Sequence, residues 1–304
     1  MSRHDFQKAL TGVSGILVAP FDREDEFNPK KLEPIIDRAI NAGTHSLVAN
    51  GNTGEFYGLT IEEAENFVIS AAEWIADRVP LTAGVGRSVR DACHLARASV
   101  TAGAKGLMVH QPPDPFVSPR GYVEYVKRVS GASNGLPLIL YLRNDQIGLD
   151  AISELCAIEN VVGVKWATPN PTILAKAIES CPDHIIWVGG LAELWAPPFY
   201  AVGARGFTSG LINVWPERSV AIHNALEFGD YPLSNTLVAG MSPFEEIRAE
   251  EMNGSNVTVV KAALAMMGND CGPTRPPSAW PLTSQQSSLL HNFLVQQGLV
   301  PSTV

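Results

Sequence analysis

A lysine interrupts the apolar run VVGVKW, residues 161–166, where a charged side chain is unexpected. The apolar residues around Lys165 predict a strand that is buried on both faces. Burying an ammonium without a partner is costly, and the usual result is a lowered pKa that leaves the amine neutral. Lys165 is therefore either a paired structural lysine whose head group reaches water, or an amine prepared to act as a nucleophile.

Two further segments carry polar groups that suit such a nucleophile. Tyr141 and Arg143 end the apolar run LILYLRN, and the turn GNTGE contains Asn52, Thr53 and Gly54. A neutral lysine can condense with a ketone, a tyrosine can move protons, and the N–H groups of a glycine-rich turn can hold a carboxylate. The combination predicts Schiff-base chemistry on a keto acid. Taken alone, the turn is better explained as a tight connection in which glycine permits positive φ.

The elements that must position these groups alternate between short apolar runs and helical patterns. Eight runs are predicted as strands: residues 12–20, 45–51, 80–86, 106–111, 136–142, 161–167, 185–190 and 206–211. Segments such as 29–43, 60–78 and 90–103 predict helices between them, and Thr60 with Glu63 forms a capping box in the second. Eight β-α units favour a (β/α)₈ TIM barrel over an open doubly wound sheet, and no G-x-G-x-x-G follows the first run.

The strand pattern ends near residue 223, and only helical patterns follow it. We therefore predict an α/β fold in two parts. Residues 1–223 form the (β/α)₈ barrel, and residues 224–304 form a C-terminal helical region that packs on the barrel rather than a free domain.

Functional groups of such barrels lie at the carboxyl ends of the strands and in the loops that follow. Lys165 belongs to the sixth predicted strand, Tyr141 ends the fifth, and the glycine-rich turn follows the second. Gly190 ends the seventh and Ser209 lies at the end of the eighth, so both join the candidate substrate-binding residues. Ser209 and Arg143 are candidates for contacts to a distal hydroxyl or carboxylate.

The composition excludes several classes of partner. The net charge of −9, without a basic stripe, disfavours nucleic acid, and no run approaches the ~20 apolar residues that span a bilayer. The amino terminus lacks the apolar region of a signal peptide, and four scattered cysteines without C-x-x-C predict reduced thiols in the cytoplasm. Without H-E-x-x-H, paired carboxylates or G-x-S-x-G, neither a metal nor a serine-hydrolase mechanism is expected, and His110 is interpreted as a core or loop histidine.

The ordered motifs resemble those of the dihydrodipicolinate synthase/N-acetylneuraminate lyase family over nearly the whole chain. VAPFDREDEFN resembles the family's opening segment, GNTGEFYGL its G-x-T-G-E turn, LILYLRN its tyrosine-bearing fifth strand and GVKWA its G-x-K strand. The resemblance implies a TIM barrel that forms homo-oligomers, tetramers or dimers. It also implies a Schiff base between Lys165 and a small 2-keto acid, without a cofactor or metal. Tyr141 would relay protons, and the turn at Asn52, Thr53 and Gly54 would bind the carboxylate.

Within that family, two positions depart from dihydrodipicolinate synthases. Gln146 stands where they carry an arginine, and QPPDPF lacks their tyrosine pair. TGEF, GGL and GPTRPP resemble instead the 5-dehydro-4-deoxyglucarate dehydratases, although WATPNP replaces the acidic, glycine-rich segment after their lysine. That resemblance implies dehydration and decarboxylation of a keto-deoxy-sugar diacid. The alternatives are a pyruvate-dependent aldolase and a keto-acid-binding homologue without turnover.

Overall fold

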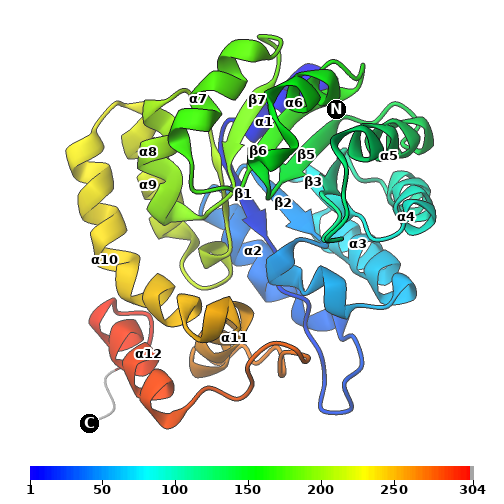
Figure 1. Cartoon of the computed structure of the whole chain (residues 1–304). Helices are drawn as coiled ribbons and strands as arrows, with labels where there is room; N and C mark the ends of the chain where they lie inside the picture. Colours follow the sequence, from blue (N-terminus) through cyan, green and yellow to red (C-terminus); the bar gives the residue numbers. More distant parts are fainter. Residues whose placement is uncertain (302–304) are drawn as a thin grey trace.

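Eight parallel strands close into a barrel in the computed structural model, which describes residues 1–301 (Figure 1). Each strand pairs with the next in sequence, and the eighth pairs with the first. The strands are β1 (Val13–Ile16), β2 (Ser46–Ala49), β3 (Leu81–Val85), β4 (Gly106–His110), β5 (Leu138–Leu142), β6 (Val161–Trp166), β7 (Ile186–Gly189) and β8 (Phe207–Ser209). Each of the eight predicted runs contains one of them, so the predicted (β/α)₈ barrel is confirmed.

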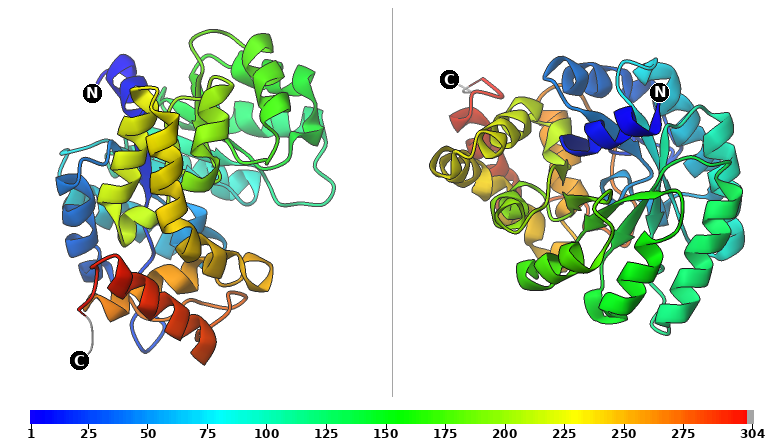
Figure 2. Two further views of the ribbon diagram at one scale, coloured as in Figure 1. Left: turned by 90° about the vertical axis from the view of Figure 1, so that its left-hand side faces the viewer. Right: turned by 90° about the horizontal axis from the view of Figure 1, so that it is seen from above.

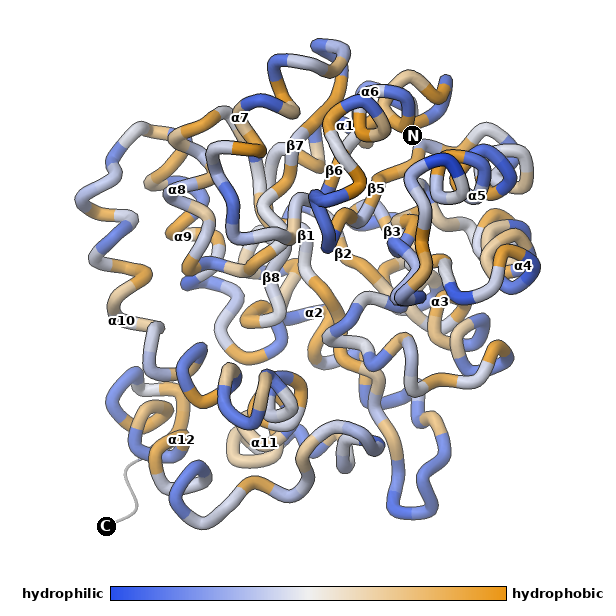
Figure 3. Tube along the Cα trace, viewed as in Figure 1, coloured by the Kyte–Doolittle hydropathy of each residue, from blue (hydrophilic) through white to orange (hydrophobic). Residues whose placement is uncertain are grey.

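Helices surround the barrel, one after each strand. They are α2 (Glu33–Asn41), α3 (Ile61–Ile75), α4 (Val89–Thr101), α5 (Pro119–Ala132), α6 (Leu149–Cys156), α7 (Pro171–Ser180), α8 (Ala196–Ala201) and α9 (Pro216–Glu227). Single 3₁₀ turns occur at η1 (Pro29–Lys31), η2 (Asn52–Gly54), η3 (Phe56–Gly58), η4 (Asp145–Ile147), η5 (Glu193–Trp195), η6 (Leu211–Asn213) and η7 (Glu251–Asn253). The predicted capping box of Thr60 and Glu63 starts α3. Figure 3 shows hydrophobic residues concentrated along the strands, and no helix among residues 1–301 is both long and apolar enough to cross a membrane.

Apolar side chains fill the barrel interior in two layers. Helix α1 (Arg3–Leu10) covers the amino-terminal end, where its Phe6 and Leu10 pack on Ile139, Val162 and Val188. A second layer lies nearer the carboxyl ends of the strands and consists of Ile16, Val48, Met108 and Tyr141. Phe6 and Leu10 of α1 therefore fill the amino-terminal end of the barrel among the described residues.

Three further helices follow the barrel: α10 (Tyr231–Ala249), α11 (Asn256–Met266) and α12 (Ser284–Gln296). Figure 2 places α1 at one end of the molecule and the pair of α11 and α12 at the opposite end. The C-terminal helices therefore lie on the side of the carboxyl ends of the strands. The boundary predicted at residue 223 falls within α9, and the division into two parts stays a prediction.

A buried ion pair connects the C-terminal helices to the glycine-rich turn. Lys261 of α11 places Nζ 2.6 Å from Oε1 of Glu55, which directly follows the turn, and donates a hydrogen bond of 2.8 Å to the carbonyl of Pro273. The other oxygen of Glu55 accepts the backbone N–H of Arg275 at 2.8 Å. Both Lys261 and Glu55 are buried, so each charge depends on the other for compensation.

Replacing Lys261 with methionine is expected to lower the free energy of unfolding by about 3 kcal/mol or more, because the Glu55 charge then stays buried without its partner. Urea titration followed by circular dichroism measures the loss. The double variant Lys261→Met, Glu55→Gln removes both charges and is expected to lose less than the single variant. The control is Lys127→Met, which breaks an exposed ion pair with Glu154 and is expected to cost less than about 1 kcal/mol. Equal losses in the Lys261 and Lys127 variants would contradict the interpretation.

Candidate active site

Lys165 and Tyr141 lie side by side on neighbouring strands. The register of β5 and β6 pairs the two residues, and the Nζ of Lys165 is 3.9 Å from the centre of the Tyr141 ring. Lys165 is 4% exposed and Tyr141 5%. The sequence predicted both residues at the mouth of one barrel, and the structure brings them into contact.

Burial and a nearby positive charge change the chemistry of the amine. Loss of hydration, followed by repulsion from the Arg143 guanidinium, lowers the pKa of Lys165 to about 7. Lys165 forms no ion pair with any carboxylate of residues 1–301. A substantial fraction of the amine is therefore unprotonated near neutral pH, which supports the nucleophile hypothesis over the paired structural lysine.

Asn52 holds the hydroxyl of Tyr141. Its Nδ2 donates a hydrogen bond of 3.0 Å to the tyrosine Oη, whereas its buried Oδ1 has no hydrogen-bond partner within residues 1–301. Burial raises the pKa of Tyr141 to about 12, so the phenol remains protonated at neutral pH and can donate to a ligand. Asn52 thus orients the phenol and leaves an acceptor of its own available.

His110 supports the ring of Tyr141 rather than the chemistry. The two rings meet edge to face with centroids 5.2 Å apart, and His110 stacks on Phe56 at 4.5 Å. Its Nε2 lies 2.9 Å from the carbonyl oxygen of Asn50. Burial lowers the pKa of His110 to about 3, which keeps the ring neutral. The structure confirms the predicted core histidine.

The glycine-rich turn follows β2 as the 3₁₀ turn η2. Thr53 faces the cavity described below, but the Gly54 N–H already donates to the Gly51 carbonyl at 3.0 Å. A Cβ on Gly54 would lie 2.9 Å from the carbonyl oxygen of Leu17, directly after β1, so this close approach excludes a larger residue there. Gly54 shapes the turn, while the hydroxyl of Thr53 and the second N–H of the Asn52 side-chain amide remain as donors for a ligand carboxylate.

One cavity of about 650 Å³ opens above Lys165 and Tyr141. Of the predicted substrate-binding residues, Asn52, Thr53, Arg143 and Gly190 line it together with the two central residues. Residues that the sequence analysis did not select also contribute, from β8 and from the loops after β6, β7 and β8: Ala167, Leu191, Ala192, Leu194, Trp195, Thr208 and Gly210.

Ser209 is placed elsewhere by the alternation of β8. Its neighbours Thr208 and Gly210 line the cavity, whereas the Ser209 hydroxyl lies 3.0 Å from the Ser219 hydroxyl and accepts the Ile212 N–H at 3.2 Å. Successive side chains of a strand point to opposite faces, which explains why Thr208 rather than Ser209 lines the cavity.

The C-terminal helices supply the remaining wall, which the sequence analysis missed. Its members come from α10, η7, α11 and the segment after α11: Glu245, Arg248, Ala249, Asn253, Asn256, Val257 and Ser278. The available signal was a pair of opposite charges, Glu245 and Arg248, three residues apart on a helix face that also buries Phe244 and Met241.

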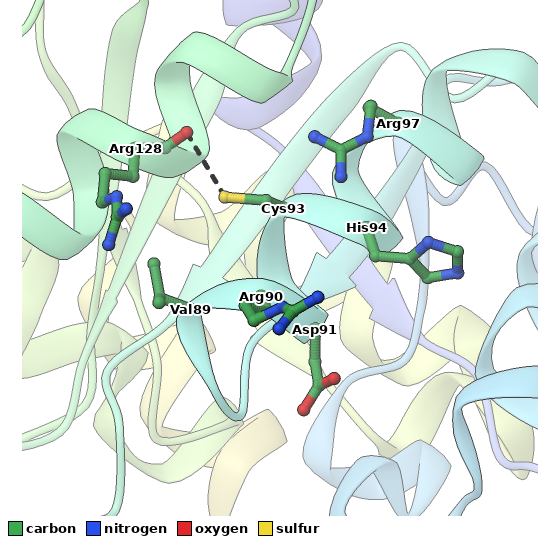
Figure 4. Close-up of a pocket in the computed structure, with 7 residues that line it drawn as sticks. All are labelled: Val89, Arg90, Asp91, Cys93, His94, Arg97 and Arg128. Atoms are coloured by element: carbon green, nitrogen blue, oxygen red, sulfur yellow. Dashed lines mark hydrogen bonds between the residues drawn. The ribbon is translucent and has the colours of Figure 1, made fainter.

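A second cavity of about 440 Å³ lies on the outer surface, between α4 and α5 (Figure 4). Arg90, His94, Arg97 and Arg128 are exposed around it, and the Cys93 thiol donates to the Arg128 carbonyl at 3.4 Å. The cavity is outside the barrel and combines no buried nucleophile with a proton donor, so the candidate active site is the one at the barrel mouth.

The chain is similar to known proteins over nearly its whole length. Residues 9–297 match the model of the dihydrodipicolinate synthetase family. A Rhodococcus opacus protein named "Probable 5-dehydro-4-deoxyglucarate dehydratase" is 32% identical over 275 residues, which cover 89% of this chain and 90% of that protein. A 4-hydroxy-tetrahydrodipicolinate synthase of Methanoculleus marisnigri is 29% identical over 294 residues, covering 94% and 99%.

A solved structure shows the same similarity in three dimensions. The dihydrodipicolinate synthase of Oceanobacillus iheyensis superposes with a TM-score of 0.92 at 35% sequence identity, covering 97% of this chain and 98% of that one. The match spans the barrel and the C-terminal helices together. The chain therefore belongs to the dihydrodipicolinate synthetase family, whose members are lyases and aldolases that act through a lysine Schiff base.

Proposed function

We propose that the protein is a Schiff-base dehydratase for a keto-deoxy-sugar diacid, of the 5-dehydro-4-deoxyglucarate dehydratase type. The observation that carries the proposal is the partly neutral Lys165 amine against the Tyr141 ring, in a cavity of a size typical for small ligands. The name of the Rhodococcus opacus relative and the GPTRPP segment support the substrate class.

Lys165 and Tyr141 can carry out the reaction in a short series of steps. The Lys165 amine attacks the keto carbon, and loss of water gives an iminium that withdraws electrons. A proton then leaves the adjacent carbon and the hydroxyl of the next carbon leaves as water, with Tyr141 moving protons. The extended iminium accepts the electron pair released as CO₂ departs from the distal carboxylate, which leaves an enamine joined to an enol. Tautomerisation of the enol gives the aldehyde, protonation of the enamine carbon restores the iminium, and hydrolysis of the iminium frees 2-oxoglutarate semialdehyde. Asn52 and Thr53 hold the carboxylate next to the keto group.

A pyruvate-dependent aldolase is the second candidate. It is favoured by the names of the Methanoculleus marisnigri relative and of the Oceanobacillus iheyensis structure. It uses the same amine and differs in the bond that breaks, so products distinguish the two. The homo-oligomeric state, tetramer or dimer, and the cytoplasmic location stay predictions, as does the third alternative of a keto-acid-binding protein without turnover.

Borohydride reduction during incubation with 5-dehydro-4-deoxyglucarate is expected to attach the substrate carbon chain covalently to Lys165, because reduction traps the imine. Peptide mass spectrometry locates the adduct. Lys165→Ala is expected to abolish it, and Lys176→Ala, at an exposed position of α7, is the control that keeps it. A product lighter by water and CO₂ supports the dehydratase. Trapping of pyruvate with release of an aldehyde supports the aldolase, and an adduct without product supports a binding protein.

Tyr141→Phe is expected to lower kcat by about 10²- to 10⁴-fold, because the ring beside Lys165 is kept and only the proton-transferring hydroxyl is lost. The trapped adduct on Lys165 is still expected to form. Steady-state rates and adduct yield measure the two effects separately. Tyr125→Phe removes a hydroxyl that bonds to the Arg87 carbonyl and is expected to leave kcat nearly unchanged. A Tyr141→Phe enzyme with the native kcat would refute the proton relay.

The pH profile of imine formation is expected to report the lowered pKa of Lys165. Only the unprotonated amine attacks, so the rate rises about tenfold per pH unit below pH 7 and levels off above the pKa of about 7. Arg143→Gln removes a positive charge that lowers this pKa, so the rising limb is expected to move to higher pH. Stopped-flow measurement across pH 5 to 10 tests this, with Arg120→Gln on exposed α5 as the unshifted control. Coincident profiles for Arg143→Gln and the native enzyme would rule out the charge effect.

A further inference from the structure

Arg248 is the most buried cation in the wall that the C-terminal helices add to the cavity. It lies near the end of α10, is 3% exposed, and lines the same cavity as Lys165. A guanidinium remains charged in a protein, so burial beside a cavity requires both compensation and a use for its remaining donors.

Two neighbours hold the guanidinium in place. Glu245, one turn earlier on α10, forms an ion pair with Nη1. Asn256, near the start of α11, accepts Nε–H through its carbonyl at 3.1 Å and Nη2–H through Oδ1 at 2.8 Å. These contacts within residues 1–301 use three of the five N–H groups, which leaves one on Nη1 and one on Nη2. The guanidinium is fixed before a ligand arrives and still has two donors.

The space between Arg248 and the glycine-rich turn is kept open by a glycine. A Cβ on Gly210, at the end of β8, would lie 2.8 Å from Nη2 of Arg248 and 3.1 Å from Oγ1 of Thr53. Arg248 and Thr53 therefore flank the same bare position, and any larger residue there would separate them. A ligand that extends from the turn past Gly210 would reach the guanidinium.

The connection from α10 to α11 has an unfavourable backbone conformation. Glu251, Met252 and Asn253 all have positive φ, between 52° and 66°, a region that residues other than glycine rarely adopt. Asn253 lines the cavity, while the side chain of Met252 is exposed on the outer surface of the protein. The left-handed turn brings Asn253 and Asn256 to the wall that holds Arg248.

We infer that Arg248 binds the distal carboxylate of the keto acid and thereby selects diacids over monoacids; this inference rests on the proposed function. The planar fork of an arginine suits a carboxylate better than a hydroxyl. Glu245 neutralises one of the two arginines that line the cavity, and Arg143 has no ion pair within residues 1–301. With Lys165 unprotonated, the lining therefore carries a net positive charge, which suits an anionic ligand.

The test compares two keto acids of equal chain length, 5-dehydro-4-deoxyglucarate and the analogue whose distal carboxylate is a hydroxymethyl group. The readout is the concentration that half-saturates borohydride-trapped adduct on Lys165, because the analogue cannot lose CO₂. The double variant Glu245→Gln, Arg248→Gln removes both buried charges together. It is expected to raise the half-saturating concentration about 10- to 100-fold for the diacid and less than about twofold for the analogue.

Two more variants keep the result interpretable. Arg248→Lys retains the charge that compensates Glu245 but loses the fork, and it is expected to give an intermediate, diacid-selective loss even if the double variant fails to fold. Arg218→Gln is the control, since its guanidinium lies over Trp215, 4.0 Å from the ring centre, outside the cavity. It is expected to change neither value.

The outcomes separate the inference from the proposed function. If the native protein forms no adduct with either keto acid, the proposed function fails. If adducts form, but the Arg248 variants change both half-saturating concentrations equally or change neither, Arg248 is structural and the inference is overturned. A loss confined to the diacid supports it.

Discussion

The structure depends on keeping one amine out of water beside a phenol. The register of β5 and β6 places Lys165 against the ring of Tyr141, and burial lowers the pKa of the amine while it raises that of the phenol. A carboxylate partner would stabilise the ammonium and remove its nucleophilicity. A closed barrel supplies an apolar surrounding without such a partner, because each backbone donor and acceptor of the strands bonds to a neighbouring strand and leaves the interior to side chains.

Much of this arrangement could be predicted from the sequence. Apolar runs of strand length marked all eight strands, and the rule that function lies at their carboxyl ends brought Lys165, Tyr141 and the glycine-rich turn to one mouth. The position along β8 was less well predicted. Ser209 was selected because it lies near the end of the strand, but the alternation of side chains along β8 directs Thr208 toward the cavity instead. A strand of three residues is too short for its apolar and polar residues to show which of them face the cavity. Gly54 was selected as a ligand-binding residue, although its N–H is used within the turn.

The C-terminal wall of the cavity could not be predicted, because it arises from contacts between residues far apart in the chain. Lys261 compensates a glutamate that is more than two hundred residues earlier, and Arg248 lies near Gly210 only once α10 has packed beside α9. The spacing of apolar residues within one segment does not predict contacts between residues so far apart in the chain. A helical pattern reports which residues of α10 are buried, but not whether they are buried against the barrel or against a cavity.

The barrel side of the cavity and the wall formed by the C-terminal helices differ in how freely their residues can be replaced. Lys165 and Tyr141 stand on paired strands, where a shift in register would move every neighbouring side chain, so the chemistry of the site is constrained by the barrel. The opposite wall consists of helix ends and connections, whose side chains can differ without disturbing a strand. Relatives with different names, a dehydratase and a synthase, are about equally similar to this chain. A difference in substrate is therefore expected in that wall and in the loops. The ion pair of Glu55 with Lys261 fixes this wall to the glycine-rich turn, and so fixes the distance between the sites that we propose for the two carboxylates of the substrate.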